Sequence, residues 1–190
     1  MKLVTYRGTV EAEGRLGVVW DGQVIDVARL GEAVGEVFAA TMLDLIDAGP
    51  DALAALRRAI EATDGKRHAG LAVPEENVRL LAPIPRPRKN IFGIGLNYVE
   101  HVAESAKSLD TSADLPKKPV VFSKPPTSVI ATGEPIQHNA EMTQQLDWEV
   151  ELAVIIGKRA TRIAKDNAMS HVFGYSVIND VSARDNRRAG

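Results

Sequence analysis

The chain has 190 residues, of which 45% are hydrophobic and 25% charged, with a formal net charge of −2. This is the balance of an ordinary globular protein, and the charge gives no general attraction to nucleic acid or to an anionic membrane, so we expect neither partner. Cysteine is absent, which excludes disulfides, thiolate zinc sites and a cysteine nucleophile. The first residues turn polar too soon for a signal peptide, and no apolar run approaches the roughly 20 residues of a membrane span, so we expect a cytoplasmic protein.

Residues 1–73 predict a small N-terminal α+β domain that opens with strands. Residues 3–6 show strand-like alternation, and two further strand-like segments follow. Asp21-Gly22 between these two is a strong signal for a two-residue hairpin turn. The expected strands cover residues 3–6, 16–20 and 24–27.

A helical pattern follows in the same domain. Leu53, Leu56 and Ile60 recur at helical spacing, which predicts one apolar helix face. Asp51 is the expected N-cap and Gly65 the expected stop. This domain shows no obvious chemistry.

Residues 74–89 predict an extended linker, and residues 90–190 a second, β-rich domain. The linker carries four prolines, and proline at that density disfavours both a helix and a central strand. After it, the expected strands cover residues 91–95, 119–122, 150–156 and 174–178, and short helices are expected at 98–107 and about 164–172.

Two carboxylates stand two residues apart in a strand-like segment, Asp147-Trp148-Glu149-Val150-Glu151-Leu152. Residues at that spacing share a strand face, so Glu149 and Glu151 point the same way about 7 Å apart. Carboxylates crowded beside a core repel each other unless a cation compensates them, and oxygen ligands suit Mg²⁺, Mn²⁺ or Ca²⁺. The alternative is a wet strand face with two solvated side chains.

A third carboxylate, Asp180, follows the expected strand at 174–178. Ends of strands commonly carry site residues, so Asp180 is a candidate third ligand. With Asn179 before it, it can equally form an ordinary turn pair.

The segment from Gly93 resembles a nucleotide-binding loop only at first sight. Gly93 and Gly95 are followed by Tyr98 where the third glycine of G-x-G-x-x-G belongs, which excludes that function. Asn97 and Glu100 fit a helix capping box.

In the helix that this box opens, His101 and Glu104 lie three residues apart on one face. The carboxylate can therefore orient the imidazole and raise its basicity, as a proton-transferring pair requires. A surface ion pair is the alternative reading.

Two cations are candidates for binding a substrate carboxylate. Lys124 follows the expected strand at 119–122 and precedes two prolines, and Arg184 follows Asp180 by four residues. Arginine would bind a carboxylate through two hydrogen bonds. Arg184 can instead pair with Asp185 or with an acid of the protein core.

Five segments together resemble the fumarylacetoacetate hydrolase family, in the branch of bacterial 2-hydroxyhepta-2,4-diene-1,7-dioate isomerases and acylpyruvate hydrolases. The resemblance covers residues 80–190 and rests on Pro83-Ile84-Pro85-Arg86-Pro87, Gly93-Ile94-Gly95-Leu96-Asn97-Tyr98-Val99-Glu100-His101, Phe122-Ser123-Lys124-Pro125, Asp147-Trp148-Glu149-Val150-Glu151-Leu152 and Asn179-Asp180-Val181-Ser182-Ala183-Arg184-Asp185.

The resemblance implies an α+β fold in which the second domain is a mixed β-roll. It implies Glu149, Glu151 and Asp180 as metal ligands, His101 and Glu104 as the catalytic pair, and Lys124 and Arg184 as substrate contacts. Family members hydrolyse, decarboxylate or isomerise small oxo-diacids, and a Mg²⁺-type ion stabilises an enolate.

The resemblance also implies a homodimer and about a hundred further residues of the catalytic domain beyond Gly190. We therefore expect a chain truncated in the C-terminal part of that domain. The alternative to an active enzyme is a metal-binding or oligomer-forming fragment without turnover.

Overall fold

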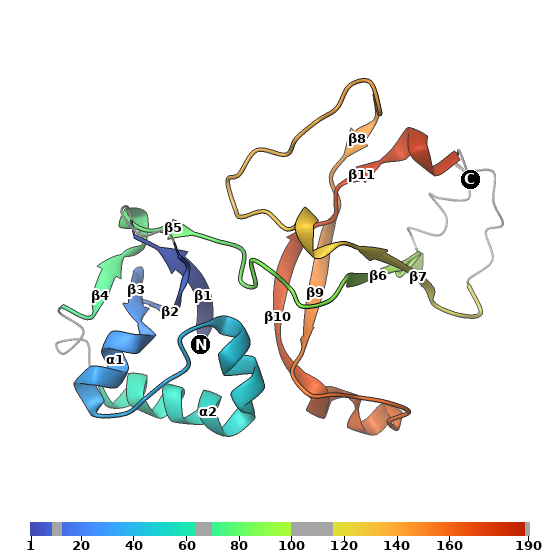
Figure 1. Ribbon diagram of the computed structural model, residues 1–190. Coiled ribbons are helices and arrows are strands. Elements are labelled where there is room, and N and C mark those ends of the chain that lie inside the picture. The colour runs from blue at the N-terminus through green and yellow to red at the C-terminus, as the bar shows by residue number, and fades with distance from the viewer. Residues whose placement is uncertain (9–12, 64–69, 100–115, 189–190) are drawn as a thin grey trace. The chain divides into compact units, whose positions relative to one another are not determined.

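The computed structural model describes residues 1–8, 13–63, 70–99 and 116–188. They form two compact units, one of residues 1–84 together with 131–190 and one of residues 85–130 (Figure 1). Helices and strands both occur, and every strand pair among the described residues is antiparallel. The α+β class is therefore confirmed, whereas the parallel pairing of a mixed β-roll is not seen in this part of the chain.

The N-terminal segment folds into a five-stranded sheet within the described residues, in the order β4-β3-β2-β1-β5. The predicted hairpin at Asp21-Gly22 is confirmed, because Trp20 pairs with Gln23 and both turn residues have positive φ, 49° and 73°. Such a turn matches the twist of the strands that it joins. The strands are β1 (Lys2–Arg7), β2 (Arg15–Trp20), β3 (Gln23–Asp26), β4 (Ala72–Pro74) and β5 (Arg79–Leu80).

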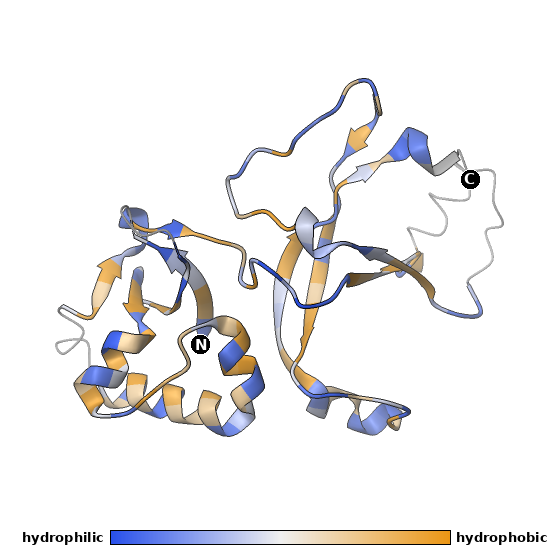
Figure 2. Ribbon diagram, in the orientation of Figure 1, coloured by the Kyte–Doolittle hydropathy of each residue, from blue (hydrophilic) through white to orange (hydrophobic). Residues whose placement is uncertain are grey.

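Two helices cover this sheet, and their apolar faces form the core. Helix α1 (Val27–Val34) begins where β3 ends, because Asp26 accepts the Arg29 N–H and caps the helix. The core residues are fully or almost fully buried, and Figure 2 shows polar residues interspersed along both helices. They include Leu16, Val18, Ile25, Leu30, Leu45, Leu56 and Ile60.

Helix α2 (Met42–Ala62) is longer than the sequence predicts. Thr41 caps it, and the chain breaks helical geometry at Gly49 (φ 81°) before Pro50 resumes it. Asp51 is therefore not the N-cap, because Pro50 already occupies the first helical position after the break, where its missing N–H costs nothing. The helix ends at Ala62, with Thr63 as its C-cap, before the predicted stop at Gly65, and Gly65 lies outside the described residues.

The stretch that we predicted as a linker contributes to the N-terminal sheet. Strand β4 reaches Pro74 and pairs with β3, and Leu80 of β5 pairs with Tyr6 of β1. A short 3-10 turn (Glu75–Asn77) joins β4 and β5. The compact units divide after Ile84 rather than at residue 73. The domain boundaries themselves stay a prediction.

The remaining elements lie in the rest of the chain, with the predicted strands at 91–95, 119–122, 150–156 and 174–178 all present. The predicted helix near 164–172 is a 3-10 segment (Lys165–His171), and the one predicted at 98–107 falls mainly on residues outside the description. The elements are β6 (Ile91–Gly95), β7 (Val120–Lys124), β8 (Leu146–Asp147), β9 (Val150–Ile156), β10 (Val172–Asn179) and β11 (Ser182–Ala183), with 3-10 turns at Pro126–Ser128 and Arg184–Arg188. No helix within the described residues is long and apolar enough to cross a membrane.

Candidate metal centre

The β9–β10 ladder places the three predicted ligands on one face. Glu151 pairs with Ile178 in antiparallel register. One step beyond the ladder, the Asp180 N–H donates to the Glu149 carbonyl oxygen at 2.8 Å. Because facing residues of an antiparallel pair point to the same side, Asp180 joins Glu149 and Glu151 on that side.

The carboxylate of Glu149 is held by its surroundings. Its Oε1 accepts a hydrogen bond from the Ser182 hydroxyl at 2.6 Å and lies 3.1 Å from Nη2 of Arg184. The side chain is only 15% exposed. The backbone of Glu149 is also fixed, since its N–H donates to Oδ1 of Asn179 at 3.1 Å. This residue therefore has a well-defined place at the end of the ladder.

Arg184 lies between two carboxylates. Its Nε and Nη2 each lie 2.9 Å from Oδ2 of Asp147, and Nη2 also reaches Glu149. The backbone N–H of Arg184 donates to the Gln145 carbonyl oxygen at 2.9 Å. Of the two roles that the sequence left open, the structure shows the pairing with acids of the protein. Contact with a substrate stays a prediction.

The segment that carries Ser182 and Arg184 is held by strand pairing and by hydrogen bonds to Asp185. Strand β11 pairs with β8, with Ser182 opposite Asp147. Asp185 accepts hydrogen bonds from the Thr143 hydroxyl and, at 2.8 Å, from the Gln144 N–H. These bonds, the one from Thr143 foremost, lower the pKa of Asp185.

Sequence reasoning missed the supporting roles of Asp147, Ser182, Thr143 and Asp185. Three of the four stand inside the motifs that carry the family resemblance. The signal was therefore present, but the partner of each side chain depends on the pairing of β8 with β11.

The metal-ligand assignment stays a prediction. Oxygen donors on one strand face suit a hard divalent cation, and Oδ1 of Asp180 is buried from solvent. The side chains themselves do not converge, since among the described residues no three His, Asp or Glu side chains form a group that could hold an ion. The backbone thus fits a three-carboxylate centre, while the Glu149 carboxylate pairs with Arg184.

The other predicted site residues are not part of the β9–β10 ladder. Lys124 ends β7, pairs with Ile91 and belongs to the second compact unit. His101 and Glu104 lie outside the described residues, as does Glu100 of the predicted capping box. The roles of all these residues stay predictions.

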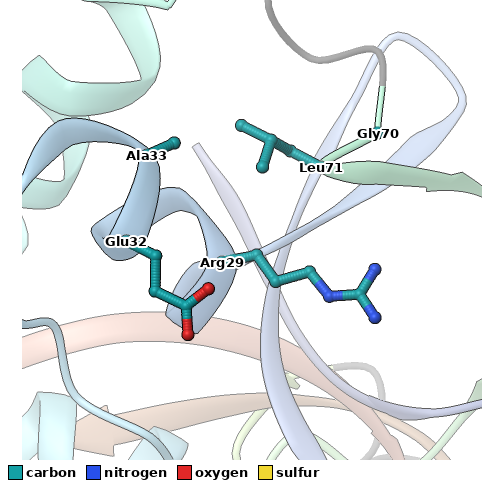
Figure 3. A pocket seen from close by; sticks show the side chains of 5 residues that line it. All are labelled: Arg29, Glu32, Ala33, Gly70 and Leu71. Carbon is teal, nitrogen blue, oxygen red and sulfur yellow. The ribbon is translucent and has the colours of Figure 1, made fainter.

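An open hollow in the N-terminal region offers no comparable chemistry (Figure 3). It is lined by Arg29, Glu32 and Ala33 of α1 and by Gly70 and Leu71 beside β4. None of the predicted site residues lines it, and Figure 3 shows the Arg29 guanidinium and the Glu32 carboxylate pointing apart. We therefore place the candidate site at the β9–β10 ladder.

A protein-family comparison matches the stretch that contains this ladder. The model for the C-terminal part of fumarylacetoacetate hydrolase covers residues 90–189. The chain belongs to the fumarylacetoacetate hydrolase family. The carboxylate-bearing segments around Glu149 and Asp180 both lie within the matched residues.

Relatives in this family are enzymes. Oxaloacetate tautomerase YisK of Bacillus subtilis (strain 168) is 50% identical over 108 residues, which are 57% of this chain and 35% of that protein. Mitochondrial oxaloacetate tautomerase fahd2 of Xenopus laevis is 35% identical over 187 residues, 97% of this chain and 53% of that protein. The chain thus spans a third to a half of these curated relatives.

Solved structures of the family share the fold. Maleylpyruvate hydrolase from Sphingobium sp. SYK-6, in complex with manganese(II) and pyruvate, matches with a TM-score of 0.68 and 28% identity. The match covers 97% of this chain and 60% of that one.

Proposed function

We propose that this chain carries the metal-binding part of a divalent-metal-dependent enzyme acting on small oxo-acids. The observation that carries the proposal is the common face of Glu149, Glu151 and Asp180 at one end of the β9–β10 ladder. The manganese(II) and pyruvate of the maleylpyruvate hydrolase complex support the same class of ion and ligand. Mg²⁺ is the ion that we expect, with Mn²⁺ or Ca²⁺ as alternatives.

When bound, such an ion would polarise the 2-oxo group of the substrate and stabilise its enolate. The chain's own residues orient the donors: the Asn179 amide and the Asp180 N–H fix the backbone of Glu149, and Ser182 and Arg184 hold its carboxylate. We further propose that His101, assisted by Glu104, transfers the proton, and that Lys124 contacts an acid group of the substrate.

Oxaloacetate is the substrate to test first, since two of the relatives described above are oxaloacetate tautomerases. The reaction moves a proton between carbon and oxygen, which is what a metal-polarised oxo-acid and a nearby base can perform. Hydrolysis of an acylpyruvate is the second reaction to test, because it needs the same enolate.

Turnover of oxaloacetate, followed by the ultraviolet absorbance of its enol, should depend on added Mg²⁺ or Mn²⁺. Glu151→Gln should remove that dependence and lower Mn²⁺ affinity at least about tenfold, because the site loses a charged ligand. Glu141→Gln is the matched control, since Glu141 is exposed and outside the ladder. Unchanged Mn²⁺ affinity in Glu151→Gln would refute the proposed centre.

A second candidate function is assembly without turnover, as a metal-binding, homodimeric module. The side of the β9–β10 ladder opposite the carboxylates favours it, because it exposes large apolar side chains: Val150, Leu152, Val154, Ile156, Tyr175 and Val177. Exposed apolar surfaces of this kind mark interaction sites. Turnover that disappears in His101→Ala would exclude this candidate as the whole function.

A further inference from the structure

The family resemblance assigns no role to Ser182, although this residue contacts Glu149. Ser182 is neutral and is neither a metal ligand nor a predicted proton carrier. Its hydroxyl nevertheless donates to Oε1 of Glu149 at 2.6 Å. That distance lies in the range of charge-assisted hydrogen bonds from a hydroxyl to a carboxylate.

The position of Ser182 is set by the backbone rather than by its own side chain. Strand β11 pairs with β8, so that Ser182 faces Asp147. The side chains of facing residues point to the same side of a ladder. Ser182 and Asp147 therefore approach Arg184 and Glu149 from one two-stranded segment, and Asp185 ties the end of this segment to Thr143 and Gln144.

Arg184 completes the arrangement from the same segment. Its Nη2 lies 3.1 Å from the same Oε1 atom that Ser182 contacts, and Asp147 holds the guanidinium at 2.9 Å. Two donors on one oxygen resist rotation of the carboxylate about its last torsion. A glutamate has several freely rotating bonds, and fixing them before a ligand arrives removes an entropic cost of binding.

We infer that Ser182 is a positioning residue that orients the Glu149 carboxylate for cation binding, with Arg184 and Asp147 as its support. This inference rests on the proposed metal centre. Hydrogen-bond partners of metal ligands commonly act in this way, and their loss weakens metal affinity by about 10- to 100-fold.

Ser182 gives a cleaner test than Arg184. Removing Arg184 deletes a positive charge, which by itself would favour a cation, and at the same time deletes a donor to Glu149, so the two effects oppose each other. Ser182→Ala removes only the hydroxyl and leaves the net charge unchanged.

The experiment measures Mn²⁺ affinity of the 190-residue chain by isothermal titration calorimetry, together with its thermal unfolding. Ser182→Ala should weaken Mn²⁺ binding about tenfold or more, and Ser182→Thr, which keeps a hydroxyl, should bind nearly as the parent does. Ser170→Ala is the matched control, because the Ser170 hydroxyl donates to the Asn167 carbonyl oxygen and Ser170 lies outside the ladder. Should Ser182→Ala fail to fold, Ser182→Cys, a weak donor of similar size, carries the same expectation.

The outcomes separate this inference from the proposed function. If the parent binds Mn²⁺, Glu149→Gln loses the binding and Ser182→Ala keeps it, the metal centre stands and the inference is overturned. A purely structural role for Ser182 would lower the unfolding temperature without changing the affinity, and this also overturns it. If the parent does not bind Mn²⁺, the proposed centre and the inference both fail.

Discussion

The N-terminal sheet and the β9–β10 ladder are both built from antiparallel strands, but the strands serve different purposes. In the sheet, Val18 and Ile25 are completely buried, because α1 and α2 cover that face. In the ladder, Leu152 is 60% and Val177 74% exposed. The first region therefore buries the apolar side chains that stabilise the fold. The second exposes apolar side chains on one side and carries the carboxylates on the other.

The hydrogen-bonded carboxylates of the two regions also serve different purposes. In the first, the buried Asp26 accepts hydrogen bonds from the Tyr6 hydroxyl, the Arg29 N–H and the Arg15 guanidinium. This network ties β1, β2 and β3 to α1 and has a structural purpose. In the second, Glu149 is held by Ser182 and Arg184 at the edge of the candidate site.

The largest expected difference between the regions concerns leucine truncation. Leu56→Ala should lower the free energy of unfolding by about 2 to 5 kcal/mol, because it opens a cavity in the N-terminal core. Leu152→Ala, the matched substitution on the exposed side of β9, should cost less than about 1 kcal/mol. Urea denaturation of both variants measures the difference, and equal losses would contradict the contrast between the regions.

An intermediate effect is expected at Asp26. Burial raises the pKa of this carboxyl, but hydrogen bonds from Tyr6, the Arg29 N–H and Arg15 outweigh it, so its pKa in the folded protein lies below the ordinary value of 3.8. The charged form therefore stabilises the fold above the ordinary pKa, and this contribution is lost as the pH falls through the lower folded-state value.

Asp26→Asn should cost about 1 to 3 kcal/mol at neutral pH, since it weakens a buried hydrogen-bond network. It should also flatten the acid side of a plot of stability against pH below 3.8. Asp51→Asn, at an exposed position of α2, is the control and should leave both quantities nearly unchanged. An unaltered acid limb in Asp26→Asn would show that other groups dominate the acid sensitivity.

The smallest effect is expected on the exposed side of β10. Val177→Thr should change the free energy of unfolding by no more than about 0.5 kcal/mol, as surface substitutions usually do. Val18→Thr, the same change in the core, should cost about 1 to 3 kcal/mol because it buries a hydroxyl. A larger loss for Val177→Thr that depends on protein concentration would instead indicate that this side is covered by another copy in solution.

Several features could be predicted because they are local. The turn at Asp21-Gly22 needs only two residues that tolerate positive φ, and both adopt it. The shared side of Glu149 and Glu151 follows from the period of two in any strand. The family resemblance likewise rests on short contiguous segments, and the family match over residues 90–189 confirms the family.

One local expectation was wrong because neighbouring residues decided the outcome. Asp51 has the chemistry of an N-cap, yet packing against the N-terminal core extends α2 back to Met42, with Thr41 as its cap. Arg79 and Leu80 stand among prolines, yet they add an edge strand to β1, where proline-rich segments are tolerated.

The sequence by itself determined the strand periods, the hairpin turn, the family and the identity of the candidate ligands. Only the tertiary structure decided that Asp180 stands opposite Glu149 and that Arg184 pairs with Asp147 and Glu149. The physical reason is distance along the chain. The registers between β9 and β10 and between β8 and β11 pair residues 16 to 37 positions apart, and no local pattern fixes which residues will face each other.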